Sequence, residues 1–327
     1  MSTSRRLMLG SLASTPLIAK TPASATPVAA WPNRPVRLVV TFAPGGSTDL
    51  VARLLAQGLQ DRLGQPVIVE NRAGAGGTTA TAHVARAEPD GYTYVFSSVS
   101  VMAVGPALYR NIQYDPMRDF AHVALVCYTH QVFVANPQFE GRNLADLIRL
   151  SRATPGGLDM ASSGAGSLNH LFIVHFANTT GARLNHVAYR GAGPAMTAVI
   201  SGEVPLMSDS LPSAASYIRQ GMVRPLGTPG AQRSQQFPEI PTFKEQGVDI
   251  VGGSWFGLAT PAGTPRAIVE RMNREVRAVL ATSKVRDRLS EFVATPGNLS
   301  VEEFTDLVQR DYNHWGPIVK ASGAVVD

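Results

Sequence analysis

The chain has 327 residues, of which 44% are hydrophobic and 16% are charged. This composition is that of an ordinary globular protein with enough apolar residues for a sizeable core, and the length is typical of about two domains. The formal net charge is +5, but Arg5, Arg6 and Lys20 lie in the first thirty residues, which leaves 26 basic and 24 acidic residues in the remainder. No run of Lys and Arg with interleaved aromatic residues occurs there, which argues against a nucleic-acid-binding face.

The first thirty residues predict a signal peptide. Arg5 and Arg6 precede an apolar stretch over 7–19, which is shorter than the roughly 20 residues that a transmembrane helix needs. Small residues mark two cleavage patterns, and we expect cleavage after Ala30. The paired arginines resemble a twin-arginine signal, and an ordinary secretory leader fits equally well. Both routes predict an exported, periplasmic protein.

Strand and helix patterns alternate at the start of the mature chain. Runs rich in β-branched and aromatic residues predict strands over 36–40, 66–70 and 91–98. Apolar residues at helical spacing predict a helix over 50–59, and a second helical stretch includes 83–86. This alternation predicts a mainly parallel sheet.

The single cysteine, Cys127, excludes an intrachain disulfide. It lies in the apolar run 122–127, which predicts a buried strand. A lone cysteine can be a nucleophile, but in this run we favour a small buried hydrophobic residue.

The middle of the chain repeats the alternation, and the chain closes with two amphipathic helices. The predicted elements are a helix over 143–151, a strand over 158–162, helices over 171–176 and 195–200, a strand over 204–207 that leads to Asp209, a β-rich run over 254–259, and helices over 265–280 and 301–320. Two sheets, with the chain passing out and back between them, predict a two-lobed α/β protein.

Three loops share one design, in which Gly with Ser or Thr follows a strand and precedes a helix. They lie at 45–48, 74–79 and 162–167. Glycine lets the backbone approach a ligand, and the first turn of a helix leaves free N–H donors at the positive end of its dipole. Such loops lie at the carboxyl ends of strands, where open α/β sheets bind ligands. Three of them favour an anion-binding role over simple turns.

Other kinds of site have no support in the sequence. No loop has the G-x-G-x-x-G pattern or the Gly-Lys-Ser/Thr ending of a P-loop, which argues against a dinucleotide or ATP. His170 and His175 are five residues apart, and no carboxylate is placed to complete a metal site, so we expect no metal or other cofactor. Without a G-x-S-x-G motif or another catalytic pattern, we do not expect an enzyme.

Several stretches of the chain together resemble the Bug family, the periplasmic solute-binding receptors of tripartite tricarboxylate transporters. They are 31–40, 42–49, 70–77, 89–93, 169–171, 189–191 and 255–257, in the family's order over nearly all of the mature chain. The resemblance implies a type II periplasmic binding fold, in which two lobes close on the ligand. It also implies that the ligand is a small organic acid, an acidic amino acid or an aromatic acid.

The resemblance places 31–125 and 255–327 in one lobe and 126–254 in the other, joined by two crossing segments. It implies that backbone amides and waters hold the ligand's carboxylate. By position, the ligand-binding residues are Phe42, Ala43, Pro44, Gly45, Gly46, Ser47, Thr48, Ala73, Gly74, Gly76, Gly77, Thr78, Ser98, Ser163, Gly164, Gly166, Ser167, Asn169 and Asp209. The implied partners of this monomeric receptor are the membrane subunits of a transporter. A sensor that presents the ligand to a signalling partner fits the same sequence.

Two positions depart from the family pattern. Ser210 stands where the family commonly has Asn after Asp, and Ala165 stands where Asn is frequent, so the expected cleft loses two amides. Asp209 leaves two interpretations open. It either selects a ligand with a hydrogen-bond donor beside its carboxylate, or it caps a helix that begins near Pro212.

Overall fold

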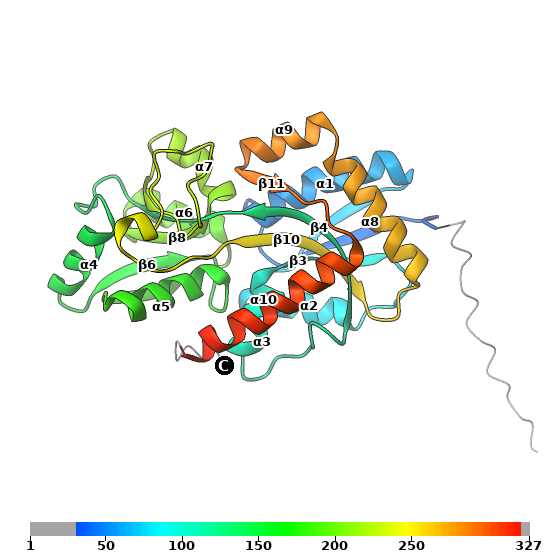
Figure 1. Cartoon of the computed structure of the whole chain (residues 1–327), viewed down its shortest axis with the longest axis horizontal. Coiled ribbons are helices and arrows are strands. Elements are labelled where there is room, and N and C mark those ends of the chain that lie inside the picture. Colours follow the sequence, from blue (N-terminus) through cyan, green and yellow to red (C-terminus); the bar gives the residue numbers. More distant parts are fainter. Residues whose placement is uncertain (1–30, 322–327) are drawn as a thin grey trace, which may run out of the picture. The chain divides into compact units, whose positions relative to one another are not determined.

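The computed structural model describes residues 31–321, so the predicted signal peptide lies outside the described residues (Figure 1). From Pro32 onward, the described chain forms two mixed β-sheets that are flanked by helices. No helix among the described residues is both long and apolar enough to cross a membrane.

The first sheet has six strands in the order β11-β4-β10-β3-β1-β2. Its strands are β1 (Val36–Val40), β2 (Val67–Asn71), β3 (Thr93–Ser98), β4 (Phe120–Thr129), β10 (Ser254–Pro261) and β11 (Ala294–Pro296). Strand β1 pairs in parallel with β2 and β3, while β10 runs antiparallel to β3 and β4. Strand β1 is almost entirely buried, which explains why it reads as an apolar run rather than as an alternating pattern.

The second sheet has five strands in the order β7-β6-β8-β5-β9. They are β5 (Gln131–Ala135), β6 (Leu158–Ser162), β7 (Leu184–Ala188), β8 (Leu206–Ser210) and β9 (Arg224–Gly227). Strand β6 is parallel to β7 and β8, and β5 is antiparallel to β8 and β9. The prediction of mainly parallel sheets therefore describes the strands next to the Gly-rich loops. The strands that carry the chain between the sheets pair antiparallel instead.

The chain leaves the first sheet and enters the second with a single intervening residue. Strand β4 ends at Thr129, and β5 begins at Gln131. The chain returns through β10, whose first residue, Ser254, pairs with Thr129. Figure 1 shows β4 and β10 side by side along this passage. The two crossing segments are therefore neighbours, and residues on them lie between the two sheets.

The helices cover the faces of the sheets. They are α1 (Ser47–Leu63), α2 (Thr78–Ala85), α3 (Gly105–Leu108), α4 (Leu144–Ala153), α5 (Leu168–Thr180), α6 (Ala192–Ser201), α7 (Leu211–Arg219), α8 (Arg266–Leu280), α9 (Ser283–Glu291) and α10 (Val301–Ala321). Short 3-10 turns lie at η2 (Ala75–Gly77) and η4 (Lys244–Gln246), and a π-helical turn lies at η3 (Ser100–Val104). Helix α1 buries an apolar stripe against β2 and α8, and it ends at Gly64, whose φ of 66° is the left-handed conformation that suits glycine.

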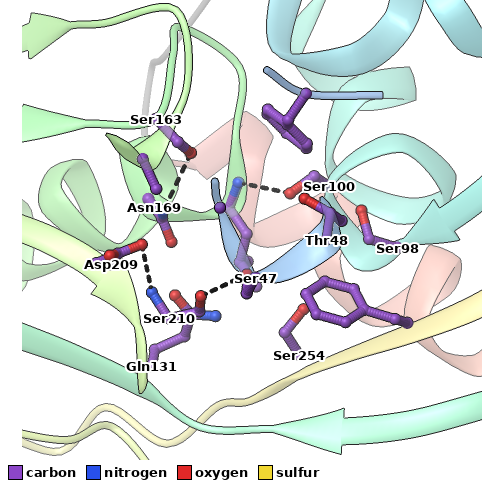
Figure 2. A pocket seen from close by; sticks show the side chains of 15 residues that line it. Ser47, Thr48, Ser98, Ser100, Gln131, Ser163, Asn169, Asp209, Ser210 and Ser254 are labelled. Atoms are coloured by element: carbon purple, nitrogen blue, oxygen red, sulfur yellow. Dashed lines mark hydrogen bonds between the residues drawn. The ribbon is translucent and has the colours of Figure 1, made fainter. Parts of the chain in front are cut away.

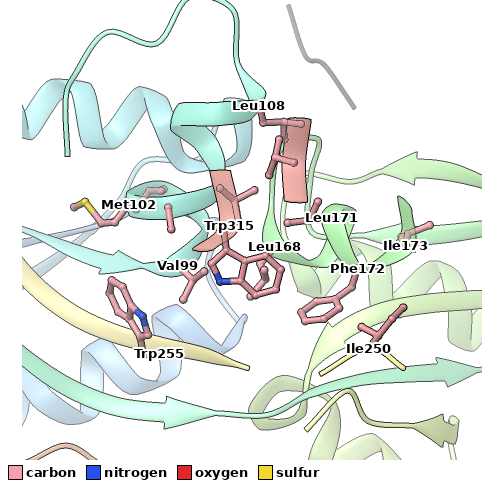
Figure 3. Packing of buried hydrophobic residues seen from close by; sticks show 14 of the residues in the cluster. Val99, Met102, Leu108, Leu168, Leu171, Phe172, Ile173, Ile250, Trp255 and Trp315 are labelled. Carbon is pink, nitrogen blue, oxygen red and sulfur yellow. The ribbon is translucent and has the colours of Figure 1, made fainter. Parts of the chain in front are cut away.

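One hydrophobic cluster continues from the first sheet's helices to α5, which packs on the second sheet (Figure 3). The Phe172 ring of α5 contacts the Trp315 ring of α10, with centroids 5.8 Å apart. Cys127 lies fully buried in β4, and burial raises the pKa of its thiol above the ordinary value. The interpretation of Cys127 as a small buried hydrophobic residue is confirmed.

Candidate functional site

A cavity, here called the central cavity, lies where elements of the two sheets meet (Figure 2). Strands β1, β3, β6 and β8 all direct their carboxyl ends or the loops that follow them toward it, which is the usual ligand position in open α/β sheets. Its lining residues are Phe42, Gly46, Ser47, Thr48, Ser98, Ser100, Gln131, Ser163, Leu168, Asn169, Ala192, Asp209, Ser210, Ser254 and Phe256. The space free of protein atoms is about 440 Å³, part of it open to solvent, and the centre of a water molecule can occupy only about 40 Å³ of it. The cavity is therefore narrow and suits a small ligand.

Three helices begin at this cavity without a side-chain cap. Helices α1, α6 and α7 have Gly46, Gly191 and Ser210 as N-cap residues, and none of these residues forms a side-chain cap hydrogen bond. The N–H groups of a first turn have no partner inside their helix, and the dipole makes this end attractive to anions. In α7 the Leu211 N–H already donates to the His130 carbonyl at 2.8 Å and Pro212 has no N–H, so α1 and α6 supply most of the amide donors. No Lys, Arg or His is among the described residues that line the cavity. An anion in the cavity would therefore be held by backbone amides and hydroxyl groups.

The carboxylate of Asp49 stabilises the loop that precedes α1. Its carboxylate accepts hydrogen bonds from the Gly45 N–H and from Asn71 Nδ2, both at 3.0 Å, and it pairs with Arg53 at 2.9 Å. Burial alone would raise the pKa of Asp49, but the hydrogen bonds from Arg53, Gly45 and Asn71 outweigh it and lower the pKa below the usual value. Asn71 Nδ2 also donates to the Phe42 carbonyl at 3.1 Å. These bonds fix the loop whose next residues line the cavity.

Hydrogen bonds join the two sides of the cavity. Ser210 Oγ, at the start of α7, donates to Ser47 Oγ, at the start of α1, at 2.7 Å. The Leu168 N–H of α5 donates to Ser100 Oγ at 2.9 Å. Both bonds link an element of the first sheet's side to an element of the second sheet's side, and they narrow the cavity between them (Figure 2).

A third bridge lies beside the cavity. The Tyr109 hydroxyl, which follows α3, donates to the Ala165 carbonyl at 2.6 Å. Gly76 and Gly166 pack closely around this bond: a Cβ built on Gly76 would lie 2.6 Å from the Ala165 carbonyl oxygen, and one on Gly166 would lie 2.3 Å from the Tyr109 ring. Side chains at either glycine would push the two loops apart.

Two polar side chains in the cavity have buried atoms with no hydrogen-bond partner among residues 31–321. They are the Ser98 hydroxyl and Gln131 Oε1, on residues that are 2% and 3% exposed. Buried polar atoms without partners are rare in proteins and destabilise them. Their position in the lining of this cavity indicates that a ligand or water completes their hydrogen bonds.

Asp209 lies at the end of β8 and lines the same cavity, where it is 1% exposed. Its carboxylate accepts from the Ser210 N–H at 2.8 Å and from the Ser213 hydroxyl. Burial raises the pKa of Asp209 to about 7, because these two hydrogen bonds only partly offset the loss of solvation. The N-cap residue of α7 is Ser210, and the helix begins at Leu211, so Asp209 is not the cap residue itself. It contacts both the cavity and the first turn of α7.

A second cavity lies next to the central one and shares Phe42 and Ser163 with it. Its other lining residues are Ala73, Gly74, Ala75, Gly76, Gly77, Gly164, Ala165, Ala188, Tyr189 and Arg190. The loop after β2 therefore faces this second cavity, although the resemblance implied that it holds the carboxylate together with the first loop. The 3-10 turn η2 packs against Ala165 and Gly166, which directs this loop away from the central cavity.

The sequence-predicted site residues divide among three places. Those that line the central cavity are Phe42, Gly46, Ser47, Thr48, Ser98, Ser163, Asn169 and Asp209. Those that line the second cavity are Phe42, Ala73, Gly74, Gly76, Gly77, Ser163 and Gly164. Those that line neither are Ala43, Pro44, Gly45, Thr78, Gly166 and Ser167. Some of the last group are structural: Ser167 Oγ caps α5 by accepting from the His170 N–H at 3.2 Å, and the Thr78 hydroxyl donates to the Ala75 carbonyl at 2.8 Å.

Seven cavity residues were not among the sequence predictions. They are Ser100, Gln131, Leu168, Ala192, Ser210, Ser254 and Phe256. Phe256 belongs to a stretch that resembles the family, and Ser210 was noted as a departure from it. Gln131 carried a weak signal of its own, because it ends a short polar run, 129–131, between two apolar runs.

Comparisons with known proteins agree with this fold. The model of the tripartite tricarboxylate transporter family receptor matches residues 51–324. The protein BugT of Bordetella pertussis is 37% identical over 304 residues, which is 92% of this chain and 93% of BugT.

Two structures of Rhodopseudomonas palustris proteins are also similar, at 33% identity each. One, with adipate, has a TM-score of 0.87 and covers 90% of this chain and 99% of its own. The other, MatC with bound malate, has a TM-score of 0.86 and covers 88% of this chain and 100% of its own. This chain belongs to the tripartite tricarboxylate transporter receptor family.

Proposed function

We propose that the protein is a periplasmic receptor that binds a small organic carboxylate in the central cavity and delivers it to the membrane subunits of a tripartite tricarboxylate-type transporter. The observation that carries this proposal is the meeting of the uncapped N-termini of α1 and α6 at a narrow cavity whose described lining has no cationic side chain. Amide donors and helix dipoles suit a carboxylate, which offers acceptors only. Binding without turnover is consistent with a receptor family.

The proposed ligand-binding residues are those that line the central cavity. The proposed lobes are 31–125 with 255–327 and 126–254, with the cavity between them. In the related structures, adipate and malate accompany proteins of the same fold, and both are small dicarboxylates. This supports a ligand of similar size and charge here.

A thermal-shift and calorimetry screen of small carboxylates tests this function. We expect at least one acid to stabilise the protein, since a ligand at 100 times its Kd adds about 2.7 kcal/mol to the free energy of unfolding. A panel of mono- and dicarboxylates that leaves the melting temperature unchanged would contradict the proposal.

Gly46→Val should abolish this stabilisation while the ligand-free protein stays folded. Gly46 has a φ of −83°, so the backbone does not exclude valine. A Cβ there would lie 3.6 Å from Ala192 Cβ, between the starts of α1 and α6, and the two added methyl groups would occupy the anion position. Gly46→Ala is the matched control, because one Cβ at ordinary contact distance should be tolerated. Equal ligand affinity in all three proteins would place the ligand elsewhere.

Export is tested with the full chain, because residues 1–30 lie outside the described structure. We expect a tagged protein to appear in the periplasm in a shortened form. Replacing Arg5 and Arg6 by Lys should stop export by the twin-arginine route and leave general secretion intact. Unprocessed protein that stays in the cytoplasm would contradict the predicted signal peptide.

A further inference from the structure

Gln131 lines the central cavity from one of the two crossing segments. It is the first residue of β5, two residues after the end of β4, so it lies on the crossing between the two sheets. In the antiparallel pairing of β5 with β8 it is directly opposite Ser210, and its neighbour Val132 is opposite Asp209. Directly opposite side chains lie on the same face of a sheet. Gln131 and Ser210 therefore enter the central cavity together (Figure 2).

The side-chain carbonyl of Gln131 is buried and has no hydrogen bond to any described residue. The residue is 3% exposed, and its Oε1 atom has no partner. A primary amide carries one acceptor and two donors, and here the acceptor is the end that is buried without a partner. Leaving such a group unsatisfied is unfavourable, so its retention in a cavity indicates a ligand that completes it.

The acceptors in this cavity define what the ligand must offer. The helix N-termini and hydroxyl groups supply donors, which a carboxylate can satisfy. Gln131 Oε1 needs a donor from the ligand, and an ionised carboxylate has none. A hydroxyl or ammonium group on the carbon next to the carboxylate would lie within the same small cavity and satisfy this acceptor.

We propose that the ligand is a 2-hydroxy or 2-amino carboxylic acid, and that Gln131 recognises the ligand's hydroxyl or ammonium group. This inference rests on the proposed function. The amide carbonyl accepts from the ligand's hydroxyl or ammonium group, and the amide NH₂ can donate to the adjacent carboxylate. The receptor then resembles the malate-bound relative more than the adipate-bound one in its ligand chemistry, because malate has such a hydroxyl and adipate does not.

Calorimetry with acids that differ by one hydroxyl tests this inference. The pairs are malate and succinate, lactate and propionate, and mandelate and phenylacetate, so that dicarboxylate, short aliphatic and aromatic frames are all sampled. In the wild-type protein we expect the hydroxy member of at least one pair to bind about tenfold tighter or more, which is the loss expected for one buried hydrogen bond of about 1.4 kcal/mol. Aspartate, compared with succinate, tests the ammonium group in the same way.

Gln131→Met should reduce this preference to within about threefold, because methionine keeps the length of the side chain and removes both polar ends. The exposed Gln232→Met is the control and should keep the preference. If Gln131→Met does not fold, Gln131→Glu keeps the acceptor and replaces the NH₂ donor. It should retain the hydroxyl preference at lower overall affinity.

The outcomes separate the two proposals. Equal binding of both members in every pair that binds overturns the inference and leaves the carboxylate receptor standing. A hydroxyl preference that survives in Gln131→Met overturns the role of Gln131. If none of the acids binds, the proposed function itself fails.

Discussion

Gly76→Ala is expected to weaken ligand binding by about fivefold or more while the protein remains folded. Gly76 has a φ of 59°, and an added Cβ would lie 2.6 Å from the Ala165 carbonyl oxygen and 2.9 Å from the Tyr109 hydroxyl. Real Cβ atoms do not approach a backbone oxygen so closely, so the loop at Gly76 must separate from the loop at Ala165. This separation breaks the contact that holds the two sides of the cavity together. Overpacking of this kind costs about 1–3 kcal/mol, which is about 5- to 150-fold in affinity.

The backbone strain of a positive φ must be separated from this clash. Gly221 has a similar φ of 68°, and a Cβ there would meet no atom within 4 Å. Gly221→Ala therefore carries the same left-handed strain, on the order of 1 kcal/mol, without the contact between loops. We expect both variants to show lowered melting temperatures, and only Gly76→Ala to show weakened ligand binding by calorimetry.

Wild-type affinity in Gly76→Ala would show that the two loops lie apart in the ligand-bound protein. Tyr109→Phe supplies an independent check, because it removes the hydrogen bond to the Ala165 carbonyl without adding an atom. It should weaken binding in the same direction but by less, since a single hydrogen bond contributes about 1 kcal/mol.

The secondary structure that the sequence predicted well consists of buried strands with clear turns on both sides. The strands at 36–40 and 158–162 have the predicted bounds, because each is bounded on both sides by polar or Gly-rich loops. Helix α5 begins three residues earlier than predicted. Its first residues, Leu168 to His170, do not read as an apolar stripe, and the start is set by the capping hydrogen bond of Ser167.

Strand β5 shows what the sequence could not reveal. Residues 120–135 form one mostly apolar stretch, which is interrupted by His122 and by the polar run 129–131. Nothing in that stretch states that the chain changes sheets there, because both halves are buried strands. The edge strand β7 was missed for the opposite reason, since it is only partly buried and lacks an apolar run.

The candidate site likewise combines residues that a local sequence pattern predicted with residues that only the three-dimensional fold brings to the cavity. The loops after β1 and β6 were found because a strand, a Gly-rich segment and a helix follow in order, which is a local pattern. Gln131 and Ser254 come from the crossing strands, and they reach the cavity only because β4, β5 and β10 meet between the sheets. The second Gly-rich loop has the same local pattern as the first but faces the second cavity. Its packing against Ala165 is a contact between distant parts of the chain.

Asp209→Asn is expected to stabilise the protein at neutral pH and to change how stability depends on pH. Asp209 loses its proton near its ordinary pKa of 3.8 in the unfolded chain, whereas burial keeps it protonated up to about pH 7 in the folded protein. Between these values the unfolded chain binds fewer protons, so the wild-type protein loses stability as pH rises from about 4 to about 7. Above pH 7 this contribution is constant. Asparagine has no group that ionises in this range, so the variant avoids this loss. Its free energy of unfolding should exceed that of the wild type by up to about 4 kcal/mol by pH 7.

Urea unfolding at pH 5, 6, 7 and 8 measures this difference. Asp287→Asn is the control, because Asp287 is exposed on α9 and its loss changes the net charge equally. A constant difference between wild type and Asp209→Asn across this range would show that Asp209 is ionised throughout, with a solvation that the described neighbours do not supply.

The same variant decides whether Asp209 selects the ligand. At pH 8 the wild-type carboxylate is ionised, and a carboxylate beside a bound anion is tolerated only if the ligand directs a donor toward it. Removing one charge-assisted hydrogen bond costs about 1.5–3 kcal/mol, so Asp209→Asn should bind a hydroxy acid about tenfold or more weakly at this pH. The analogue without the hydroxyl should bind equally or more tightly, because the repulsion is gone. If both affinities stay unchanged and only the unfolding curve moves, Asp209 serves the start of α7 through Ser210 and Ser213 and has no part in ligand choice.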